Sequence, residues 1–423
     1  MRSKRLIHVV WIVVALVALS GLASAQTKTK ITFWSHTHPP MVELYEKLIA
    51  EYEALNPHVD IEYTAVPNNE FFMKMLTAMS TRTGPDVFAM SSTQIAAYLQ
   101  RGTVAPILPE AFGFSSQEEL VASYVGNALN AVTYNGAVYG VPSEFNASAL
   151  LINTAHFREA GLDPDNPPRT WDEVVEYSRK LTVRDGNRLV RRGFDFYYLP
   201  NFYWLDFQNL LSQFGGHILS PDGKTAVLND EAGVKALTFW YDLVHKEQLA
   251  GAQWSIRDSV DTLADFVNGS VSMMIAYPWA IGSLQGSPVW DDVKIVPLPQ
   301  VNPERPVTHG YAYFWMVSNT AADKLEAWKF VNFLASHPLR WLHEVGFVQP
   351  KKGWSDDPKA QEFPFLDVWL DAMSKSDFGD LSPNWAEVSS AIQRAIESSI
   401  MNGVAPQRAL DQAKREIDAA LRQ

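Results

Sequence analysis

The most constraining feature of this sequence is a regular alternation of apolar patterns between residues 31 and 90. Segments with the apolar pattern of a strand alternate with segments that have the 3.6-residue period of a helix. The patterns predict strands at 31–34, 59–65 and 86–90 and helices at 41–55 and 70–80. This order favours a parallel sheet, which binds ligands beyond the carboxyl ends of its strands. The loops after Trp34, Val66 and Met90 are therefore expected to line a binding site.

The rest of the chain also shows α/β character and ends in helices. Asn-Gly within residues 134–139 predicts a hairpin turn, and Thr170 is expected to cap a helix. Apolar residues at helical spacing fill 385–400, Gly403 ends that pattern, and a last helix is expected at 406–421. The predicted fold class is α/β with a helical C-terminal region.

The N-terminus has the pattern of a secretory leader. Residues 1–5 are basic, residues 6–19 are mainly apolar, and Ala23-Ser24-Ala25 fits a cleavage site before Gln26. An uncleaved anchor is the alternative, but the apolar run is shorter than the ~20 residues needed to cross a bilayer. The pattern predicts an exported protein in the periplasm that is soluble once its leader, residues 1–25, has been removed.

Composition excludes several classes of function. The chain has no cysteine, which rules out disulfides, thiolate metal sites, cysteine nucleophiles and a lipid-modified N-terminal cysteine. It has 47 acidic against 35 basic residues, so a partner that needs a basic surface, such as nucleic acid or an anionic membrane, is not expected.

The common catalytic motifs are absent from the sequence. No G-x-S-x-G or G-x-G-x-x-G occurs, and the Gly223-Lys224-Thr225 segment lacks the earlier glycine of a phosphate loop. His36 and His38 could hold a metal together with a carboxylate, but a polar binding loop explains them more simply. Glu144 could be half of a glycosidase pair, for which the sequence indicates no second carboxylate. We therefore expect neither an enzyme nor a cofactor.

Five segments, in order, resemble the extracellular solute-binding proteins of ABC importers, in the branch that includes maltose-binding protein. The first, residues 31–88, begins ITFWSHTHPP and ends TRTGPDVF. The others are YNGAVYGVPSEFNASALLIN, FVNGSVSMMIAYPWAIG, GYAYFWMVSNTAADKLEAWKFVNFLAS and the ending from Ala391. Together they span nearly the whole chain after the leader, from Ile31 to the C-terminal helical region.

The resemblance implies a two-lobed periplasmic-binding-protein fold of type II, in which each lobe is a mainly parallel sheet flanked by helices. The first lobe would hold 26–143 and 298–336, and the second 144–297 and 337–423. The family binds its solute in the cleft by hinge closure. A membrane permease with its ATPase then receives the solute, and the binding protein itself is expected to be a monomer.

The resemblance also nominates residues of the ligand site. In the first lobe these are Trp34, Ser35, His36, Ser91, Ser92, Thr93, Gly310 and Tyr311. At the first hinge crossing and in the second lobe they are Glu144, Asn146, Tyr203, Trp204, Trp279 and Trp354. Trp279 occupies the place where relatives stack a tryptophan on the sugar, and its alternative is a core tryptophan. Asp86 is interpreted as a structural residue near the start of a strand.

The expected ligand is a carbohydrate, most simply a di- or oligosaccharide, because sugars need aromatic faces together with polar partners. The same fold could instead bind a polyamine, a glycerol phosphate or a metal. A secreted carbohydrate-active enzyme is the alternative from another class.

Overall fold

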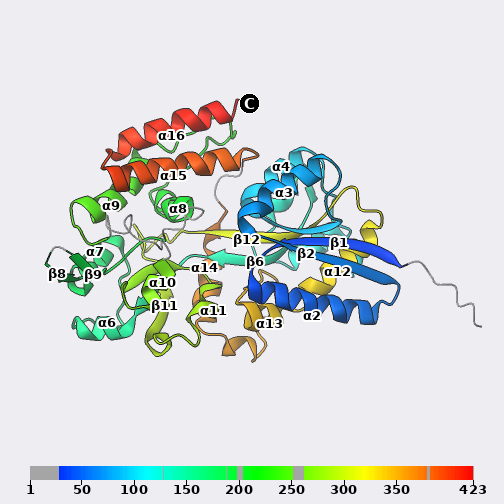
Figure 1. Ribbon diagram of the computed structural model, residues 1–423, viewed down its shortest axis with the longest axis horizontal. Coiled ribbons are helices and arrows are strands. Elements are labelled where there is room, and N and C mark those ends of the chain that lie inside the picture. The colour runs from blue at the N-terminus through cyan, green and yellow to red at the C-terminus, as the bar shows by residue number, and fades with distance from the viewer. Residues whose placement is uncertain are drawn as a thin grey trace, which may run out of the picture.

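The computed structural model describes residues 28–126, 128–186, 188–197, 203–250, 262–378 and 382–422. The expected leader and its cleavage site lie outside these residues. The chain forms two α/β halves that lie side by side along the long axis (Figure 1). We call them the large-sheet half, whose sheet begins with residues 29–36, and the small-sheet half, whose sheet is centred on residues 149–153.

The large sheet begins with the elements predicted from the first alternation. Its parallel strands are β1 (Thr29–His36), β2 (Val59–Val66) and β3 (Val87–Ser91), and the connecting helices are α2 (Pro39–Leu55) and α3 (Asn68–Ser80). β1 lies between β2 and β3, so the β-α-β-α-β prediction is confirmed. Asp86 accepts hydrogen bonds from the backbone and the hydroxyl of Thr32 at 2.8 Å, which fixes β3 beside β1.

A strand from much later in the chain completes this sheet. β12 (Thr308–Val317) runs antiparallel to β3 on one side and to β6 (Val141–Ala147) on the other. The short β13 (Ser376–Asp377) pairs parallel with the start of β12. The large sheet is therefore mixed, because β12 runs in the direction opposite to β3 and β6.

The small sheet differs from the expected mainly parallel arrangement. β7 (Ala149–Asn153) lies in its centre, and β10 (Met273–Ala276) and β11 (Val293–Pro297) both pair with it antiparallel. Within the described parts of the chain, the parallel contacts beside this sheet are isolated bridges, such as Asp195 with Met274. The expectation fails because β10 and β11 each return along β7 instead of crossing over to run with it.

The small sheet separates two cores. Ala149 and Leu151 of β7 face a core that continues from the large sheet, whereas Leu150 and Ile152 face a second core. This follows from the alternation of side chains along a strand. Helices of the small-sheet half cover the second core, and they are α7 (Trp171–Leu181), α8 (Tyr203–Gln213), α9 (Glu231–His245), α15 (Trp385–Asn402) and α16 (Pro406–Ala420).

The remaining elements are shorter or peripheral. Helices are α4 (Ser92–Gln100), α5 (Gln117–Ala122), α6 (Thr154–Glu159), α10 (Thr262–Val267), α11 (Ala280–Leu284), α12 (Lys324–Ala335), α13 (Pro338–Arg340) and α14 (Leu366–Ser374). Two hairpins are formed by β4 (Thr133–Tyr134) with β5 (Ala137–Val138) and by β8 (Val183–Asp185) with β9 (Arg188–Arg191). No helix within the described residues is long and apolar enough to cross a membrane.

The predicted hairpin turn, helix cap and helix end are present in the structure. Asn135 and Gly136 both have positive φ, 49° and 80°, as the tight hairpin turn requires. Thr170 and Glu173 form a reciprocal capping box at the start of α7. Gly403 ends α15 in the left-handed conformation.

The chain passes between the halves at short connections. Ser148 alone separates β6 of the large sheet from β7 of the small sheet, and residues 298–307 connect β11 to β12. The Ser148 hydroxyl donates to the carbonyl of His309 at 2.7 Å and accepts from the Asn209 amide of α8 at 2.9 Å. Hydrogen bonds therefore tie these two crossings to each other and to the small-sheet half.

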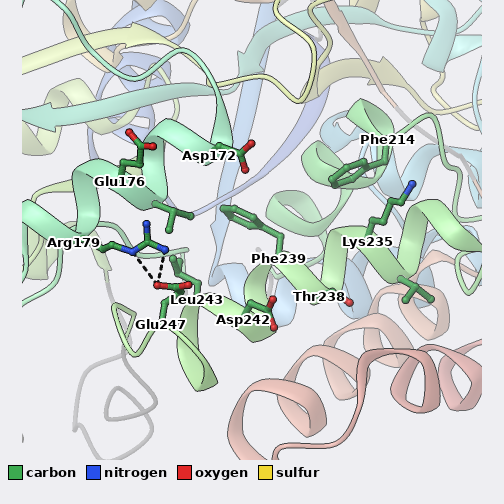
Figure 2. Close-up of a pocket in the computed structure, with 12 residues that line it drawn as sticks. Asp172, Glu176, Arg179, Phe214, Lys235, Thr238, Phe239, Asp242, Leu243 and Glu247 are labelled. Carbon is green, nitrogen blue, oxygen red and sulfur yellow. Dashed lines mark hydrogen bonds and ion pairs between the residues drawn. The ribbon is translucent and has the colours of Figure 1, made fainter.

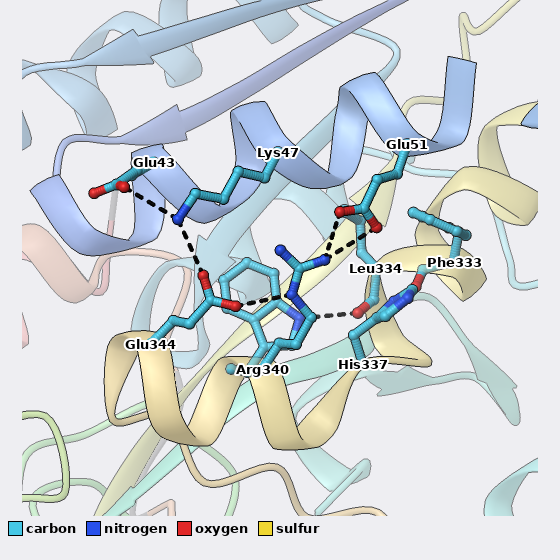
Figure 3. Close-up of polar contacts among 9 residues, drawn as sticks. Glu43, Lys47, Glu51, Phe333, Leu334, His337, Arg340 and Glu344 are labelled. Carbon is cyan, nitrogen blue, oxygen red and sulfur yellow. Dashed lines mark hydrogen bonds and ion pairs between the residues drawn. The ribbon is translucent and has the colours of Figure 1, made fainter. Parts of the chain in front are cut away.

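The chain after α12 stays on the large-sheet half for longer than the expected crossing at Ser336. Arg340 pairs with Glu51 of α2 at 2.9 Å and with Glu344 at 2.8 Å, and Glu344 also meets Lys47 of α2 at 3.2 Å (Figure 3). The helical turn η6 (Trp341–Val345) packs beneath these ion pairs against α2.

Candidate ligand-binding site

The junction of the two sheets brings together buried polar groups from β6 and aromatic rings from β12. Glu144 and Asn146 lie on β6, and their register partners on β12 are Tyr313 and Tyr311. The exposed fraction is 3% for Glu144 and 1% for Asn146. β6 ends one residue before the crossing at Ser148, so the fold itself places these side chains between the halves.

Aromatic rings lead from the large sheet towards the junction. The imidazole of His36, at the carboxyl end of β1, lies 4.6 Å from the ring of Tyr313. The ring centroids of Tyr313 and Tyr311 are 6.3 Å apart, and those of Tyr311 and Tyr277 are 5.9 Å apart. Tyr277 follows β10 of the small sheet. The row of rings therefore connects the carboxyl end of a large-sheet strand to the other half.

Trp279 ends this row on the small-sheet side. Its ring stacks on Tyr277 with centroids 6.1 Å apart and 12° between the planes, and Tyr197 meets its edge at 6.0 Å. The half-buried Trp279 packs against both cores. A side chain at Gly346 would lie 3.3 Å from the Pro278 carbonyl, so the segment after η6 passes directly beside this loop. Trp279 is thus a residue of the junction and not of one core.

Several buried polar atoms at the junction make no hydrogen bond of good geometry within the described residues. They are Nδ1 of His36, Oε2 of Glu144 and both side-chain polar atoms of Asn146. Leaving such a group unsatisfied costs about 1–3 kcal/mol, so buried polar atoms in native proteins normally have a partner. A ligand with polar groups and apolar faces could hydrogen-bond to these atoms and pack against the neighbouring aromatic rings.

The ionisable groups of the junction are held in their neutral forms. Burial raises the pKa of Glu144 to about 8, although the nearby Asn146 amide partly opposes this shift. Burial, together with the neighbouring His38, lowers the pKa of His36 to about 3. At neutral pH the site therefore offers a protonated carboxyl group, a neutral imidazole and an amide, which suit an uncharged polar ligand better than an ion.

Asp206 is a buried carboxylate near the junction that sequence reasoning missed. It lies on α8 with no exposed surface, and its Oδ2 accepts the backbone N–H of Tyr197 at 2.7 Å. The hydroxyl of Tyr277 lies 3.5 Å from its Oδ1. Burial raises the pKa of Asp206 to about 7. The signal that the sequence offers is a single acidic residue within the apolar and aromatic run that forms the first turns of α8.

Some nominated residues of the first lobe lie beside the junction but are already engaged. The Ser35 hydroxyl is 2.7 Å from the hydroxyl of Tyr63, and the ring of Trp34 lies under the Lys74 ammonium at 5.0 Å. Ser91 and Thr93 hydrogen-bond to each other at 3.0 Å. The Ser92 hydroxyl accepts the backbone N–H of Ala312 at 3.3 Å, which ties the start of α4 to β12.

Four other nominated residues have evident packing roles. Tyr203 packs near Trp240, and Trp204 lies between His309 and Trp385, with ring centroids at 5.8 and 5.0 Å. Trp354 donates its indole N–H to the Gln349 carbonyl at 2.9 Å. A side chain at Gly310 would lie 2.8 Å from the Asn146 carbonyl, so this glycine lets β12 approach β6 closely. Contact between any of these residues and a ligand stays a prediction.

Two further features of the described residues bear on function. Among the described residues, no group of three or more histidine, cysteine or acidic side chains is placed to hold a metal ion. A surface groove lies between α7 and α9, lined by Phe214, Phe239 and the ion pair of Arg179 with Glu247 (Figure 2). None of the nominated residues lines this groove.

Two α/β halves, joined at short crossings with a polar and aromatic site between them, define a two-lobed binding protein. The chain belongs to the bacterial extracellular solute-binding protein family, whose family model matches residues 38–339. This confirms the resemblance seen in the sequence, and it places the chain among binding proteins and not among enzymes.

Individual relatives and solved structures agree with this assignment. The chain is 22% identical to a maltotriose-binding protein from Pyrococcus abyssi, over 87% of this chain and 77% of that protein. It is 24% identical to an arabinooligosaccharide-binding protein from Halalkalibacterium halodurans, over 93% and 90% respectively. The sugar-binding protein MalE from Xanthomonas citri has a TM-score of 0.79 at 19% identity, covering 93% of this chain and 98% of that one. The maltose-bound MalE3 of T. maritima has a TM-score of 0.78 at 22% identity, covering 92% and 99%. The two-lobed fold is confirmed.

Proposed function

We propose that this protein is the extracellular solute-binding subunit of an ABC importer and that it binds a di- or oligosaccharide between its halves. The observation that carries this proposal is the set of buried polar atoms of Glu144 and Asn146 that lack a well-formed hydrogen bond. They lie beside Tyr311, whose ring leads through Tyr277 to Trp279. The names of the relatives, which bind maltotriose and arabinooligosaccharides, support the same ligand class.

The chemistry of the site matches that of a neutral sugar. A pyranose ring presents apolar C–H faces that pack on aromatic rings, and its hydroxyl groups both donate and accept hydrogen bonds. A protonated Glu144 can donate one hydrogen bond and accept another, and the Asn146 amide can do both as well. A polyamine would need ionised carboxylates here, and a glycerol phosphate would need cations, so a neutral ligand fits better.

We infer lobe limits close to those expected, 26–143 with 298–336 and 144–297 with 337–423, with two adjustments. The pairing of β6 with β12 moves the first crossing to Ser148. The packing of η6 on α2 moves the third crossing beyond Val345. The two lobes would then close on the sugar, and the closed monomer would deliver it to the permease.

A ligand panel tests this function. Thermal unfolding is measured with maltose, maltotriose and arabinotriose, and with spermidine, glycerol 3-phosphate and Zn²⁺ as representatives of the alternative classes. A saccharide should raise the melting temperature in a concentration-dependent way. Chromatography of the sugar after incubation should recover it intact. Stabilisation by an alternative ligand alone would refute the sugar assignment, and hydrolysis of the sugar would refute the binding function.

The leader makes a separate prediction about export. We expect the mature protein in the periplasm to begin at Gln26, because residues 1–25 have the pattern of a cleaved secretory signal. Intact-mass measurement of protein recovered from the cell envelope checks this. A mass that retains Met1 to Ala25 would contradict it.

A further inference from the structure

Asp206 stands out because its charge has no cationic partner among the described residues that contact it. The other fully buried carboxylate in this region, Asp195, pairs with Arg192 at 2.5 Å. Asp206 instead meets the backbone N–H of Tyr197 and the hydroxyl of Tyr277. Burying a carboxyl group costs free energy that these two hydrogen bonds only partly offset. Its presence therefore calls for a role other than stability.

Both partners of Asp206 are neighbours of the same indole ring. Tyr277 stacks on Trp279 almost in parallel, and Tyr197 meets the edge of that ring at 70°. One carboxyl group on α8 therefore holds the backbone of one neighbour and the hydroxyl of the other. The hydroxyl of Tyr277 also interacts with Ser148, so it is held both from α8 and from the first crossing.

We propose that Asp206 is a positioning residue for saccharide binding, which sets the orientation of Trp279 by holding Tyr197 and Tyr277. This inference rests on the proposed function only for the statement that Trp279 contacts the sugar. The geometric part, control of the indole by a carboxyl group from another element, holds for the ligand-free protein as well.

Substitutions at Asp206 separate hydrogen bonding from packing. Asp206→Asn keeps an acceptor for the Tyr197 N–H and supplies a donor towards Tyr277, so it should preserve the arrangement. Asp206→Ala removes both contacts. Leu205→Ala is the matched control, because Leu205 is a fully buried neighbour on α8 whose truncation destabilises the same helix without removing a polar contact. Tyr277→Phe removes only the hydroxyl and provides a second route if Asp206→Ala does not fold.

The readout is the ¹⁹F NMR signal of Trp279 in protein labelled with 5-fluorotryptophan, assigned by its loss in Trp279→Phe. Without ligand, Asp206→Ala and Tyr277→Phe should shift or broaden this signal, whereas Asp206→Asn and Leu205→Ala should leave it in place. With maltotriose and arabinotriose as probes, the affinity for the saccharide that binds should fall about tenfold in Asp206→Ala and stay within about twofold in Asp206→Asn.

The outcomes distinguish this inference from the proposed function. An unchanged Trp279 signal in Asp206→Ala and Tyr277→Phe, or an equal change in Leu205→Ala, would overturn the positioning role. A shifted Trp279 signal in a protein that binds neither saccharide would support the positioning role and refute the sugar assignment. A shifted signal with unchanged saccharide affinity would show that Trp279 orientation is irrelevant to binding and would overturn the inference.

Discussion

At the scale of single residues, Trp279 gives the sharpest test of the site. Trp279→Ala removes the stacking face at the junction and should weaken saccharide binding by about 1–3 kcal/mol, a five- to 150-fold rise in dissociation constant. Trp290→Ala is the control, because Trp290 is also half-buried but lies outside the junction. Isothermal titration calorimetry measures both variants. Equal saccharide affinities for the two variants would show that Trp279 has a structural role and does not bind the saccharide.

Glu144 should make the stability of the protein depend on pH. Its pKa is about 8 in the folded protein, against 4.5 for an exposed glutamate, so the folded state binds the proton more tightly than the unfolded state. The free energy of unfolding should therefore fall as pH rises from about 5 to 8, by at most ~1.4 kcal/mol per pH unit from this group. Asp206, with a pKa of about 7, acts in the same direction.

Urea unfolding at pH 5, 6, 7 and 8 measures this effect. Glu144→Gln should flatten the profile and gain stability relative to the wild type as pH rises, and subtracting the two profiles removes the contribution of Asp206. The exposed Glu176→Gln serves as the control. Parallel profiles for the wild type and Glu144→Gln would show that Glu144 is already ionised at pH 5.

The residues of the site differ in how far the sequence could predict them. Trp279 and Glu144 could be nominated because each lies in a short motif that resembles a known family, and both lie at the junction. Asp206 could not, because its role depends on Tyr277, 71 residues further along the chain. No local pattern reports which ring a carboxylate will face after folding.

At the scale of elements, the contact between β6 and β12 depends on one glycine. Gly310→Ala would place a methyl group 2.8 Å from the Asn146 carbonyl and 3.0 Å from the Phe145 ring. Because a backbone carbonyl in a sheet cannot move aside freely, we expect a loss of about 1–3 kcal/mol in the free energy of unfolding. The control is Gly282→Ala, where the added methyl group meets nothing within 4 Å. Equal stability of the two variants would contradict close packing at this position.

The sequence predicted the first three strands and two helices because each carries its own periodic pattern. It could not predict that β12 would lie between β3 and β6, because strand order depends on contacts between distant segments. The antiparallel direction of β10 and β11 was missed for the same reason. Apolar runs indicate that a strand exists, but they carry no information about the direction of its neighbour.

At the scale of the whole molecule, the proposed binding mode requires closure. A saccharide can contact both Tyr311 of the large sheet and Trp279 of the small-sheet half only when the two halves are close together. Ligand should therefore favour the closed state through its higher affinity for that state. Small-angle X-ray scattering should show a smaller radius of gyration for the saccharide complex than for the free protein. Identical profiles at saturating saccharide would indicate a site that is already closed without ligand.

The late arrival of β12 also has a consequence for the newly made chain. β3 and β6 are complete by residue 147, but the strand that must lie between them begins at residue 308. At a synthesis rate of about 5–20 residues per second, the large sheet lacks this strand for roughly 10 to 30 seconds. During that interval the edges of β3 and β6 cannot pair as they do in the finished protein, and the long-range contacts that complete the sheet are intrinsically slow to form. The order of the strands thus delays completion of the large sheet until most of the chain has been synthesised, and we expect the growing chain to lack a finished large-sheet half during that interval.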